Sequence, residues 1–400
     1  MVVRDMFATA MRTDNFNATE IVQPPPPRKL YFPYVDLARA GAVTLVLFFH
    51  IIVVLEWVSF PESGFLSIFR LGWIGVDLFF VISGFVITLS LGRNVDNFGR
   101  HGYMKPYFKN RLARIVPLYY LTSLCFIMVS VWQWSGEPLH KVVINILSHA
   151  FFVHSLSHVY AGALNGPAWS IGVEMQFYVF MALLFKWLPV HRPFLVCFTF
   201  MAVALAWRAG VWYTFNTSLN ILILVSRVQQ LPAVLDAFGL GCAIALIVRN
   251  HGHWLHKYLQ TSWNNAAAWF IIAVIFSTVS WKMLVVYQAY WYLWWMVILF
   301  RSLLAFSFAF WICFLISLPE RWLLIRVLSP FSYVGKVSYG IYLWHMLVIF
   351  FVIKLGMAHP SWKAAVLVVL LTLAISSFTW HFFEQPLIRK YHDKPRRGTA

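Results

Sequence analysis

Two basic side chains, Arg39 and His50, stand eleven residues apart in one apolar stretch. At about 100° per residue this spacing is three helical turns plus roughly 20°, so both side chains project from one helical face. The helical rise separates them by about 16 Å, which predicts a guanidinium at the mouth of a membrane cavity and a titratable imidazole near the bilayer midplane. The pair suits a long ligand whose phosphates stay at the mouth while its reactive end reaches inward.

A structural interpretation of the same two residues stays open. Arg39 would pair with Asp36 and extend toward lipid headgroups, and His50 would only bond a neighbouring helix.

A second basic pair, Arg111 and Arg114, begins another apolar stretch. Three residues apart on a helix, the two guanidinium groups can converge on one anion, and guanidinium pairs suit phosphate. The alternative is the ordinary positive charge that flanks cytosolic helix ends.

Two carboxylates, Asp77 and Glu174, fall inside apolar stretches, where an ionisable side chain costs a few kcal/mol and is a functional candidate. A carboxylate in such a place can orient a histidine or accept a proton from an incoming hydroxyl. Either residue is a candidate to orient His50, and the sequence does not decide between them. The alternative for Glu174 is a buried ion pair with Arg208 or Arg301.

The run from Ser338 to His345 opens a further apolar stretch with two tyrosines, Tyr339 and Tyr342, three residues apart. We expect Tyr342 and His345 to line the ligand cavity. Anchoring at the membrane interface explains Tyr339 and Trp344 equally well.

Helices must position these side chains, because a segment that crosses lipid has to satisfy its own backbone hydrogen bonds. The fold class that we expect is therefore an all-α, polytopic membrane bundle of about ten transmembrane helices. A further apolar stretch at 139–156 contains three histidines and predicts a short surface or re-entrant helix. The ten spans are predicted at 37–59, 74–92, 115–132, 167–188, 194–213, 233–249, 266–285, 293–317, 338–357 and 362–383.

Composition excludes a soluble globular protein, since 61% of the 400 residues are hydrophobic and only 11% are charged. The net charge of +17 does not indicate nucleic-acid binding, because the 31 Lys and Arg gather in short clusters between apolar stretches. With the N-terminus taken as cytosolic, connections on that side hold 22 of them and connections on the opposite side hold 4. This asymmetry predicts a multi-pass protein of the cell inner membrane with both termini in the cytosol.

The domain organisation predicted from these patterns is a membrane domain at 37–385 between two tails. The tail at 1–36 is polar, contains four consecutive prolines, and is expected to be cytosolic and disordered. The tail at 386–400 is expected to be basic and cytosolic. No metal is expected, because the four cysteines lie in separate apolar stretches without neighbouring ligands.

Six motifs, in order along residues 31 to about 390, together resemble the acyltransferase family 3 of integral membrane enzymes. Its bacterial O-acetyltransferases modify surface polysaccharides, lipopolysaccharide, Nod-factor-like oligosaccharides or macrolides. The motifs are Arg39-x10-His50, the run Gly75–Val76–Asp77–Leu78–Phe79–Phe80–Val81–Ile82–Ser83–Gly84–Phe85, Arg111-x-x-Arg114, Trp169–Ser170 with Glu174, the run Ser338 to His345, and Phe383–Glu384–Gln385–Pro386.

The resemblance implies transfer of an acyl group, commonly acetyl, from cytosolic acyl-coenzyme A to a hydroxyl of a carbohydrate or glycolipid. It implies a catalytic role for His50 and a donor-binding role for Arg39, Arg111 and Arg114. Some members of the family carry a fused hydrolase-like domain after the last span. Since this chain ends 17 residues after residue 383, we expect it to pass the acyl group to its acceptor directly or through a separate protein.

Two other classes of function are compatible with the same residues. A transporter or flippase would use Asp77, Glu174, His50 and His345 to relay protons or to bind an anionic solute. A lipid-binding scaffold would need His50 and Arg39 for stability alone.

Overall fold

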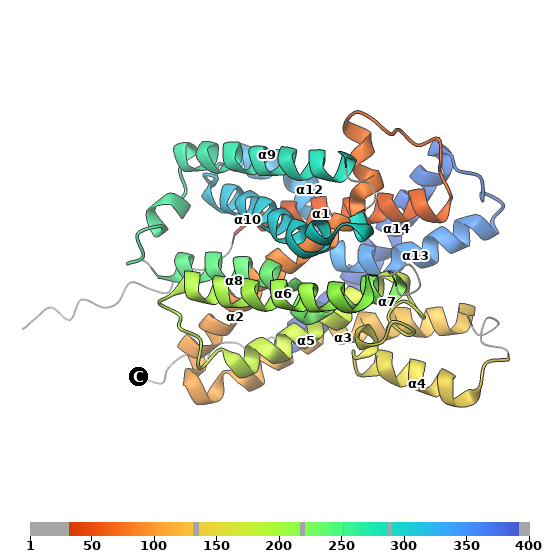
Figure 1. Cartoon of the computed structure of the whole chain (residues 1–400), viewed down its shortest axis with the longest axis horizontal. Coiled ribbons are helices and arrows are strands. Elements are labelled where there is room, and N and C mark those ends of the chain that lie inside the picture. Colours follow the sequence, from red (N-terminus) through yellow and green to blue (C-terminus); the bar gives the residue numbers. More distant parts are fainter. Residues whose placement is uncertain (1–31, 131–135, 217–220, 251, 287–289, 392–400) are drawn as a thin grey trace, which may run out of the picture. The chain divides into compact units, whose positions relative to one another are not determined.

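The computed structural model describes residues 32–130, 136–216, 221–250, 252–286 and 290–391. The predicted N-terminal tail, residues 1–36, lies outside the described residues except for its last five residues. Residues 392–400 of the predicted basic tail also lie outside them. Within the described ranges the regular secondary structure is helical, with no strand. This agrees with the all-α bundle predicted from the apolar stretches (Figure 1).

A helix occupies each of the ten predicted spans. Eight helical segments within the described ranges are long and apolar enough to cross a bilayer, and a ninth is the pair α12–α13, which is bent by 70°. The helix α5 has only 16 residues, so at 1.5 Å per residue it is shorter than a bilayer core of about 30 Å. The ten helices are α1 (Val35–Val54), α2 (Gly75–Gly102), α3 (Met104–Ser130), α5 (Trp169–Leu184), α6 (Pro193–Phe215), α8 (Leu235–Arg249), α9 (Trp263–Val286), α10 (Arg301–Ser317), α13 (Ser338–Lys354) and α14 (Trp362–Thr379).

Shorter elements join and extend these helices. Five residues of π-helix precede α10, and another five follow α14 before the chain continues into α15. The predicted basic tail therefore begins as a helix. The shorter helices are α4 (Leu139–Ala150), α7 (Ile221–Arg227), α11 (Trp322–Val327), α12 (Ser329–Lys336) and α15 (Gln385–Tyr391).

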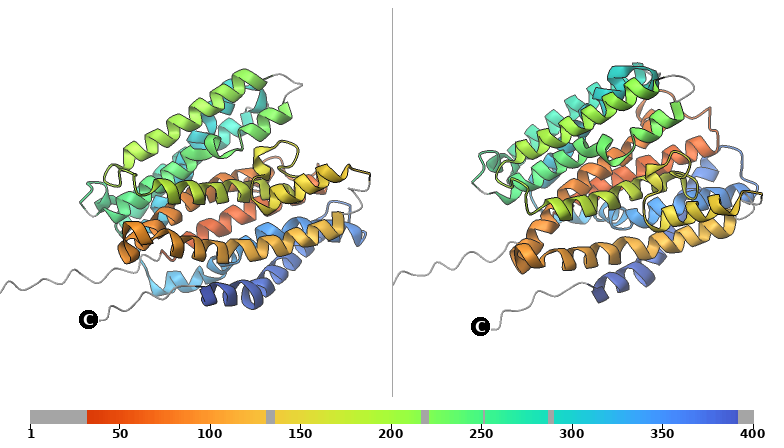
Figure 2. Two further views of the ribbon diagram at one scale, coloured as in Figure 1. Left: turned by 90° about the horizontal axis from the view of Figure 1, so that it is seen from below. Right: turned by 60° about the horizontal axis from the view of Figure 1, so that its bottom comes forward.

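The centre of the bundle is formed by α2 and α8, which lie side by side (Figure 2). Buried residues make up 78% of the apolar window of α2 and 89% of that of α8, against 17% for α9 and 22% for α14. Close packing is possible because α8 is rich in Gly and Ala. A Cβ atom at Gly84 of α2 would collide with the backbone carbonyl of Phe238 in α8, so any larger residue would push the two helices apart.

A second group of helices packs around α1, which contacts α12, α13 and α2. The start of α1 is fixed by a hydrogen bond of 3.0 Å from the Tyr34 hydroxyl to the carbonyl of Pro319. The starts of α1, α3 and α13 lie at one end of the bundle, because Arg39, Arg111 and Ser338 line a common cavity there. The fold thus brings together three segments that are far apart in the sequence.

The opposite end carries α4 and the connection that follows it, drawn in yellow at the right of Figure 1. One face of α4 is apolar and exposed, with Val143 and Leu147 among its residues, while Asn145 and His149 are buried beneath it. This amphipathic helix occupies the place of the short surface or re-entrant helix predicted at 139–156.

Candidate active site

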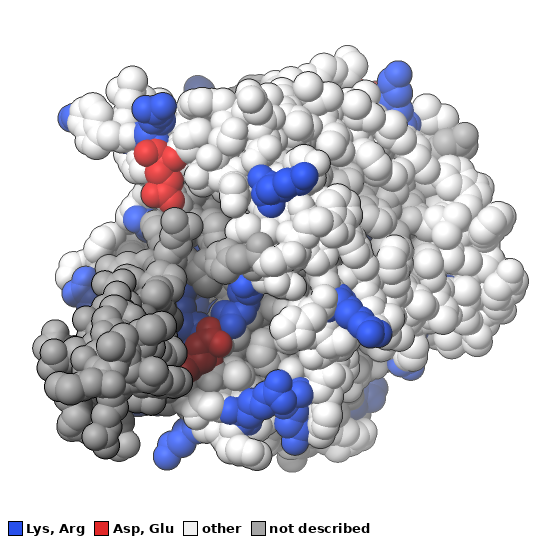
Figure 3. Space-filling model, turned by 90° about the vertical axis from the view of Figure 1, so that its left-hand side faces the viewer, with Lys and Arg blue, Asp and Glu red and all other residues white. Residues whose placement is uncertain are grey.

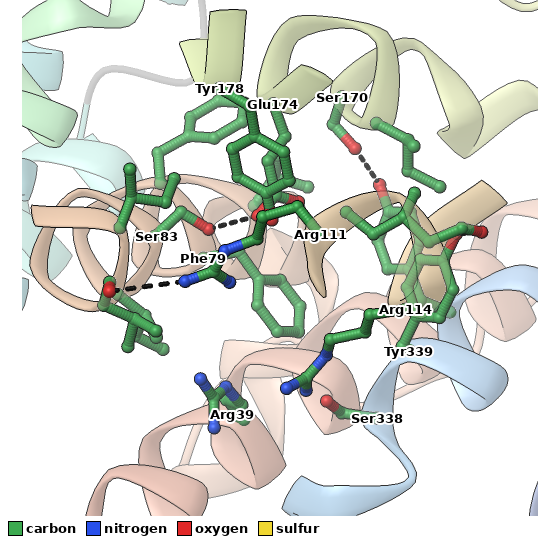
Figure 4. Close-up of a pocket in the computed structure, with 18 residues that line it drawn as sticks. Arg39, Phe79, Ser83, Arg111, Arg114, Ser170, Glu174, Tyr178, Ser338 and Tyr339 are labelled. Atoms are coloured by element: carbon green, nitrogen blue, oxygen red, sulfur yellow. Dashed lines mark hydrogen bonds between the residues drawn. The ribbon is translucent and has the colours of Figure 1, made fainter. Parts of the chain in front are cut away.

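A cavity of about 90 Å³ opens between α1, α2, α3, α5 and α13. Cationic side chains surround one part of it and hydroxyl and carboxylate groups another (Figure 4). Its volume is below the range of about 300–1,000 Å³ that is common for small-molecule sites. An acyl donor of ordinary size therefore enters only if lining side chains move.

All three arginines of the predicted donor site line this cavity. Arg39 forms an ion pair of 2.5 Å with Asp36, as the structural interpretation of its sequence position required. Arg111 lies over the ring of Tyr178, with its guanidinium carbon 5.4 Å from the ring centroid, and donates a long hydrogen bond of 3.4 Å to the carbonyl of Val86. Arg114 has no ion pair or hydrogen bond within the described residues, so its donors remain available to a ligand.

Glu174, on α5, lies beside Arg111 and farther from Arg39 and Arg114 (Figure 4). Its Oε1 atom accepts hydrogen bonds from the hydroxyls of Ser83, at 2.6 Å, and Tyr178, at 2.7 Å. The carboxylate is thus held on α5 by a donor from α2 and by one from its own helix. Its second oxygen accepts no hydrogen bond from the residues that the structure describes, so it can accept one from a ligand hydroxyl.

Tyr342, on α13, also lines the cavity. Its hydroxyl donates to the carbonyl of Pro167 at 2.8 Å and lies 2.6 Å from the hydroxyl of Ser170. These contacts tie α13 to the start of α5. Tyr342 therefore lines the cavity as expected, in a fixed orientation.

His50 and His345 lie next to each other just beyond Tyr342. The ring centroids of His50 and His345 are 5.0 Å apart, and those of His345 and Tyr342 are 5.9 Å apart. Neither histidine lines the cavity, so the single passage predicted from Arg39 to His50 is interrupted in this structure by Tyr342 and His345. His50 lies four residues before Val54, the last residue of α1. It is therefore nearer to the end of this helix than the predicted position at the bilayer midplane.

The tautomers of both histidines follow from their partners. Nδ1 of His50 lies 2.8 Å from the carbonyl of Val46, and Nδ1 of His345 lies 3.1 Å from the carbonyl of Ile341. A carbonyl oxygen can only accept, so in each neutral ring the proton sits on Nδ1 and the lone pair on Nε2. His50 is therefore oriented by a backbone carbonyl, and the expectation that Glu174 or Asp77 orients it through a hydrogen bond is corrected.

Asp77 lies elsewhere, on the side of α2 that faces α10. It forms a buried ion pair of 3.1 Å with Arg301, which also donates to the carbonyl of Val228 at 2.6 Å. A second buried ion pair, between Arg208 and Asp236, measures 2.7 Å. These two pairs use the arginines that were the alternative partners of Glu174, so that alternative is wrong. Asp77 does not line the cavity.

Several lining residues were not predicted as site residues, notably Ser83, Ser170 and Tyr178. Ser170, Glu174 and Tyr178 are spaced by four residues, so they follow one face of α5. That spacing was the signal in the sequence. Nothing local could have shown that Ser83 from α2 meets this face, because the contact joins residues 91 positions apart.

Metal ligands do not cluster in the described part of the chain: no three His, Cys, Asp or Glu side chains there are grouped so that they could hold an ion.

The sequence was also compared with known proteins. A family model described as an acyltransferase domain matches residues 32–381, which is nearly the whole described bundle. The chain belongs to the acyltransferase 3 family. All the cavity-lining residues of this acyltransferase 3 domain, and both histidines beside the cavity, fall within the matched range.

Individual relatives within the acyltransferase 3 comparison are distant. The chain is 26% identical over 321 residues to a putative acetyltransferase, ORF330, of Acidianus two-tailed virus, covering 80% of this chain and 84% of the relative. It is 27% identical over 383 residues to the peptidoglycan O-acetyltransferase OatA of Listeria monocytogenes, covering 89% and 56%. It is 24% identical over 406 residues to the O-acetyltransferase OatA of Staphylococcus aureus, covering 95% and 60%. No solved structure matches the chain.

The match covers most of this chain but little more than half the length of each OatA protein. The chain spans 56% of the Listeria protein and 60% of the Staphylococcus protein.

Proposed function

We propose that the protein is a membrane O-acyltransferase that moves an acyl group, most simply acetyl, from acyl-coenzyme A to a hydroxyl of a surface or exported carbohydrate. The observation that carries the proposal is the cavity that Arg39, Arg111 and Arg114 line together with Glu174, next to the His50–His345 pair. The acyltransferase domain supports the reaction class. The peptidoglycan O-acetyltransferases among the relatives favour a cell-wall sugar as acceptor.

In the proposed mechanism the donor enters from the end of the bundle where Arg39 lies. The phosphates of coenzyme A are held by the unpaired Arg114 and by Arg111, with Arg39 available when it releases Asp36. The pantetheine arm and thioester then extend past Glu174 toward Tyr342. Because the cavity is narrow, donor binding widens it by rotating lining aromatic side chains such as Phe79.

The acyl transfer itself is assigned to His50. Its Nε2 lone pair takes the proton of the acceptor hydroxyl as the hydroxyl oxygen attacks the thioester carbonyl carbon. The carbon–sulfur bond breaks, and the departing thiolate receives the proton from the imidazolium, so that free coenzyme A and an ester are the products. For this step Tyr342 and His345 must move far enough to join the cavity to His50.

Glu174 is assigned to the acceptor side of the cavity. A carboxylate held by Ser83 and Tyr178 is well placed to accept a hydrogen bond from a sugar hydroxyl and to fix its direction of attack. The transporter alternative loses one of its relay residues, because Asp77 is engaged by Arg301.

The test uses the purified protein in proteoliposomes with acetyl-coenzyme A and a soluble peptidoglycan fragment. Thiol release is followed with a colorimetric reagent, and acetylated sugar by mass spectrometry. A transferase releases coenzyme A and acetylates the sugar only when both substrates are present, and Glu174→Ala lowers both signals together. Solute movement without thioester consumption would instead establish the transporter.

A further inference from the structure

A second, larger cavity of about 300 Å³ lies at the same end of the bundle as Arg39. It is formed by the last turns of α2 and α8 and by the connection that follows α5, and it shares no lining residue with the candidate active site. On α2, Gly92 lines this cavity and Ser83 lines the other. They are nine residues apart, so at about 100° per residue they project from opposite sides of the helix. The two cavities are therefore separate sites.

The polar lining of the second cavity is cationic. Arg100 and Lys186 line it without an ion pair in the described residues, and the Lys186 ammonium lies 3.9 Å from the centroid of the Trp187 ring. The acidic residue in its lining, Asp96, is already neutralised, because Nη2 of Arg249 bonds both of its carboxylate oxygens at 2.8 and 3.1 Å. The cavity consequently keeps a positive charge that no group in its wall compensates. Figure 3 shows this end of the molecule, where blue Lys and Arg side chains outnumber red acidic ones.

The position of Arg249 is built into the helix packing. Its guanidinium lies against α2 at Gly92, where a Cβ atom would collide with it. A side chain at this position would make the guanidinium shift, whereas glycine lets it lie directly against α2 on its way to Asp96. The ion pair therefore forms part of one wall of the cavity, and among the described residues it leaves Arg100 and Lys186 without an acidic partner.

The rest of the wall is apolar and aromatic. Val95 and Leu246 contribute aliphatic surface, and Phe185 and Tyr103 contribute rings. Tyr103 is fixed by a hydrogen bond of 2.6 Å from its hydroxyl to the carbonyl of Ala182. An apolar wall beside uncompensated cations fits a ligand that carries both a phosphate and an apolar or aromatic part.

We propose that this cavity is a second ligand site, which binds a phosphate group carried on an apolar or aromatic molecule. Two sources have that chemistry: an anionic phospholipid of the adjacent leaflet and a soluble nucleotide. Bound there, the phosphate bridges Arg100 at the end of α2 and Lys186 just after α5. These helices carry Ser83 and Glu174, so occupancy restrains both walls of the candidate active site without touching the substrates.

The experiment measures binding to the purified, delipidated full-length protein in a neutral detergent. The probes are short-chain phosphatidylglycerol, short-chain phosphatidylcholine and 3′-phosphoadenosine 5′-phosphate, each titrated against the thermal unfolding midpoint. The test variant is Arg100→Gln/Lys186→Gln, and Arg100→Lys/Lys186→Arg keeps the charge. The matched control is Arg389→Gln/Lys390→Gln, which removes two exposed cations from α15.

We expect at least one phosphate probe to bind the wild type and the control equally, and to bind the Arg100→Gln/Lys186→Gln variant about tenfold or more weakly. The charge-keeping variant should bind within a few-fold of wild type, since Coulombic attraction is retained. If phosphatidylglycerol binds and the nucleotide does not, the ligand is a lipid. If the nucleotide binds and phosphatidylglycerol does not, the ligand is a soluble nucleotide. Equal affinities of the test and control variants, or no binding of either phosphate probe, would overturn the proposal.

This test is independent of the transferase reaction. Arg111→Gln/Arg114→Gln removes cations from the active-site cavity alone, so it should leave binding at the second cavity unchanged. A phosphate probe whose affinity falls in that variant, and not in Arg100→Gln/Lys186→Gln, occupies the active-site cavity and counts against the second site.

Discussion

The imidazole rings of His50 on α1 and His345 on α13 lie with their centroids 5.0 Å apart, and each ring donates its Nδ1 proton to a carbonyl one turn earlier. Both Nε2 lone pairs are therefore free in the neutral rings. His345 Nε2 is buried without a partner in the structure. A free Nε2 lone pair on each ring suits a base that must take a proton and return it within one turnover.

Replacing His50 by alanine is expected to lower kcat by about 10²–10⁴-fold, the usual range for loss of a positioned general base. Coenzyme A release from acetyl-coenzyme A in the presence of acceptor measures the effect. The control is His359→Ala, which removes an exposed histidine from the loop between α13 and α14. A His50→Ala enzyme as active as the control would contradict the mechanism.

Replacing His345 by asparagine should lower kcat less than His50→Ala does, because His345 supports the proton on His50 and does not meet the hydroxyl. Residues that act as a unit are not additive. The double variant should thus be no slower than His50→Ala alone. Multiplicative losses, measured in the same coenzyme A assay, would show that the two histidines act independently.

Replacing Arg111 or Arg114 by lysine keeps the charge but removes the planar fork that binds phosphate through two bonds. Each substitution should raise KM for acetyl-coenzyme A by about tenfold, the equivalent of one charge-assisted hydrogen bond. We expect kcat to stay near the wild-type value, since the thioester end is untouched. Arg389→Lys is the control, and an unchanged KM in both test variants would remove these arginines from the donor site.

Replacing Asp77 by asparagine leaves Arg301 buried without a counter-charge, which is expected to lower the free energy of unfolding by about 3–5 kcal/mol. Replacing both partners, as Asp77→Leu/Arg301→Met, should restore most of that loss because no buried charge remains. Denaturant unfolding in detergent compares the two. If Asp77→Asn proves as stable as Asp77→Leu/Arg301→Met, an unpaired buried charge at Arg301 does not destabilise the protein.

Stability is expected to fall in mild acid because of His149 and His154, which stack with ring centroids 4.1 Å apart. Burial, and then the neighbouring His154, lower the pKa of His149 to about 4; burial also lowers the pKa of His154. The unfolded chain takes up protons near pH 6.5, whereas folded His149 resists them until about pH 4. Stability is therefore lost as pH falls across that window, by about 3 kcal/mol for His149 alone.

The thermal unfolding midpoint of wild type should fall as pH is lowered from about 7 to 5. His149→Gln cannot take up a proton, so its midpoint should depend less steeply on pH. Equal slopes in the two proteins would assign the acid sensitivity to other groups.

The helices were predictable because a segment that crosses lipid can satisfy its backbone hydrogen bonds only within itself. Each predicted apolar stretch does contain a helix. The cavity was predictable in part, since helical spacing places Arg111 with Arg114 and Glu174 with Tyr178. The partner of Asp77 was not, because Arg301 lies 224 residues away and the contact depends on how α2 packs on α10. The meeting of His50 with His345 depends on tertiary packing in the same way.

The contact at Gly84 limits how the enzyme can accommodate its substrates. With the α2 backbone pressed on that of α8, this side of the active-site cavity cannot recede without separating the two most buried helices of the molecule. Widening of the cavity to admit a thioester must therefore come from rotation of side chains such as Phe79 or from movement of the other helices that line the cavity. Among these is α3, which is only 28% buried in its apolar window and so presents much of its surface to lipid. The composition and lateral pressure of the surrounding bilayer would then act directly on the rate of substrate entry.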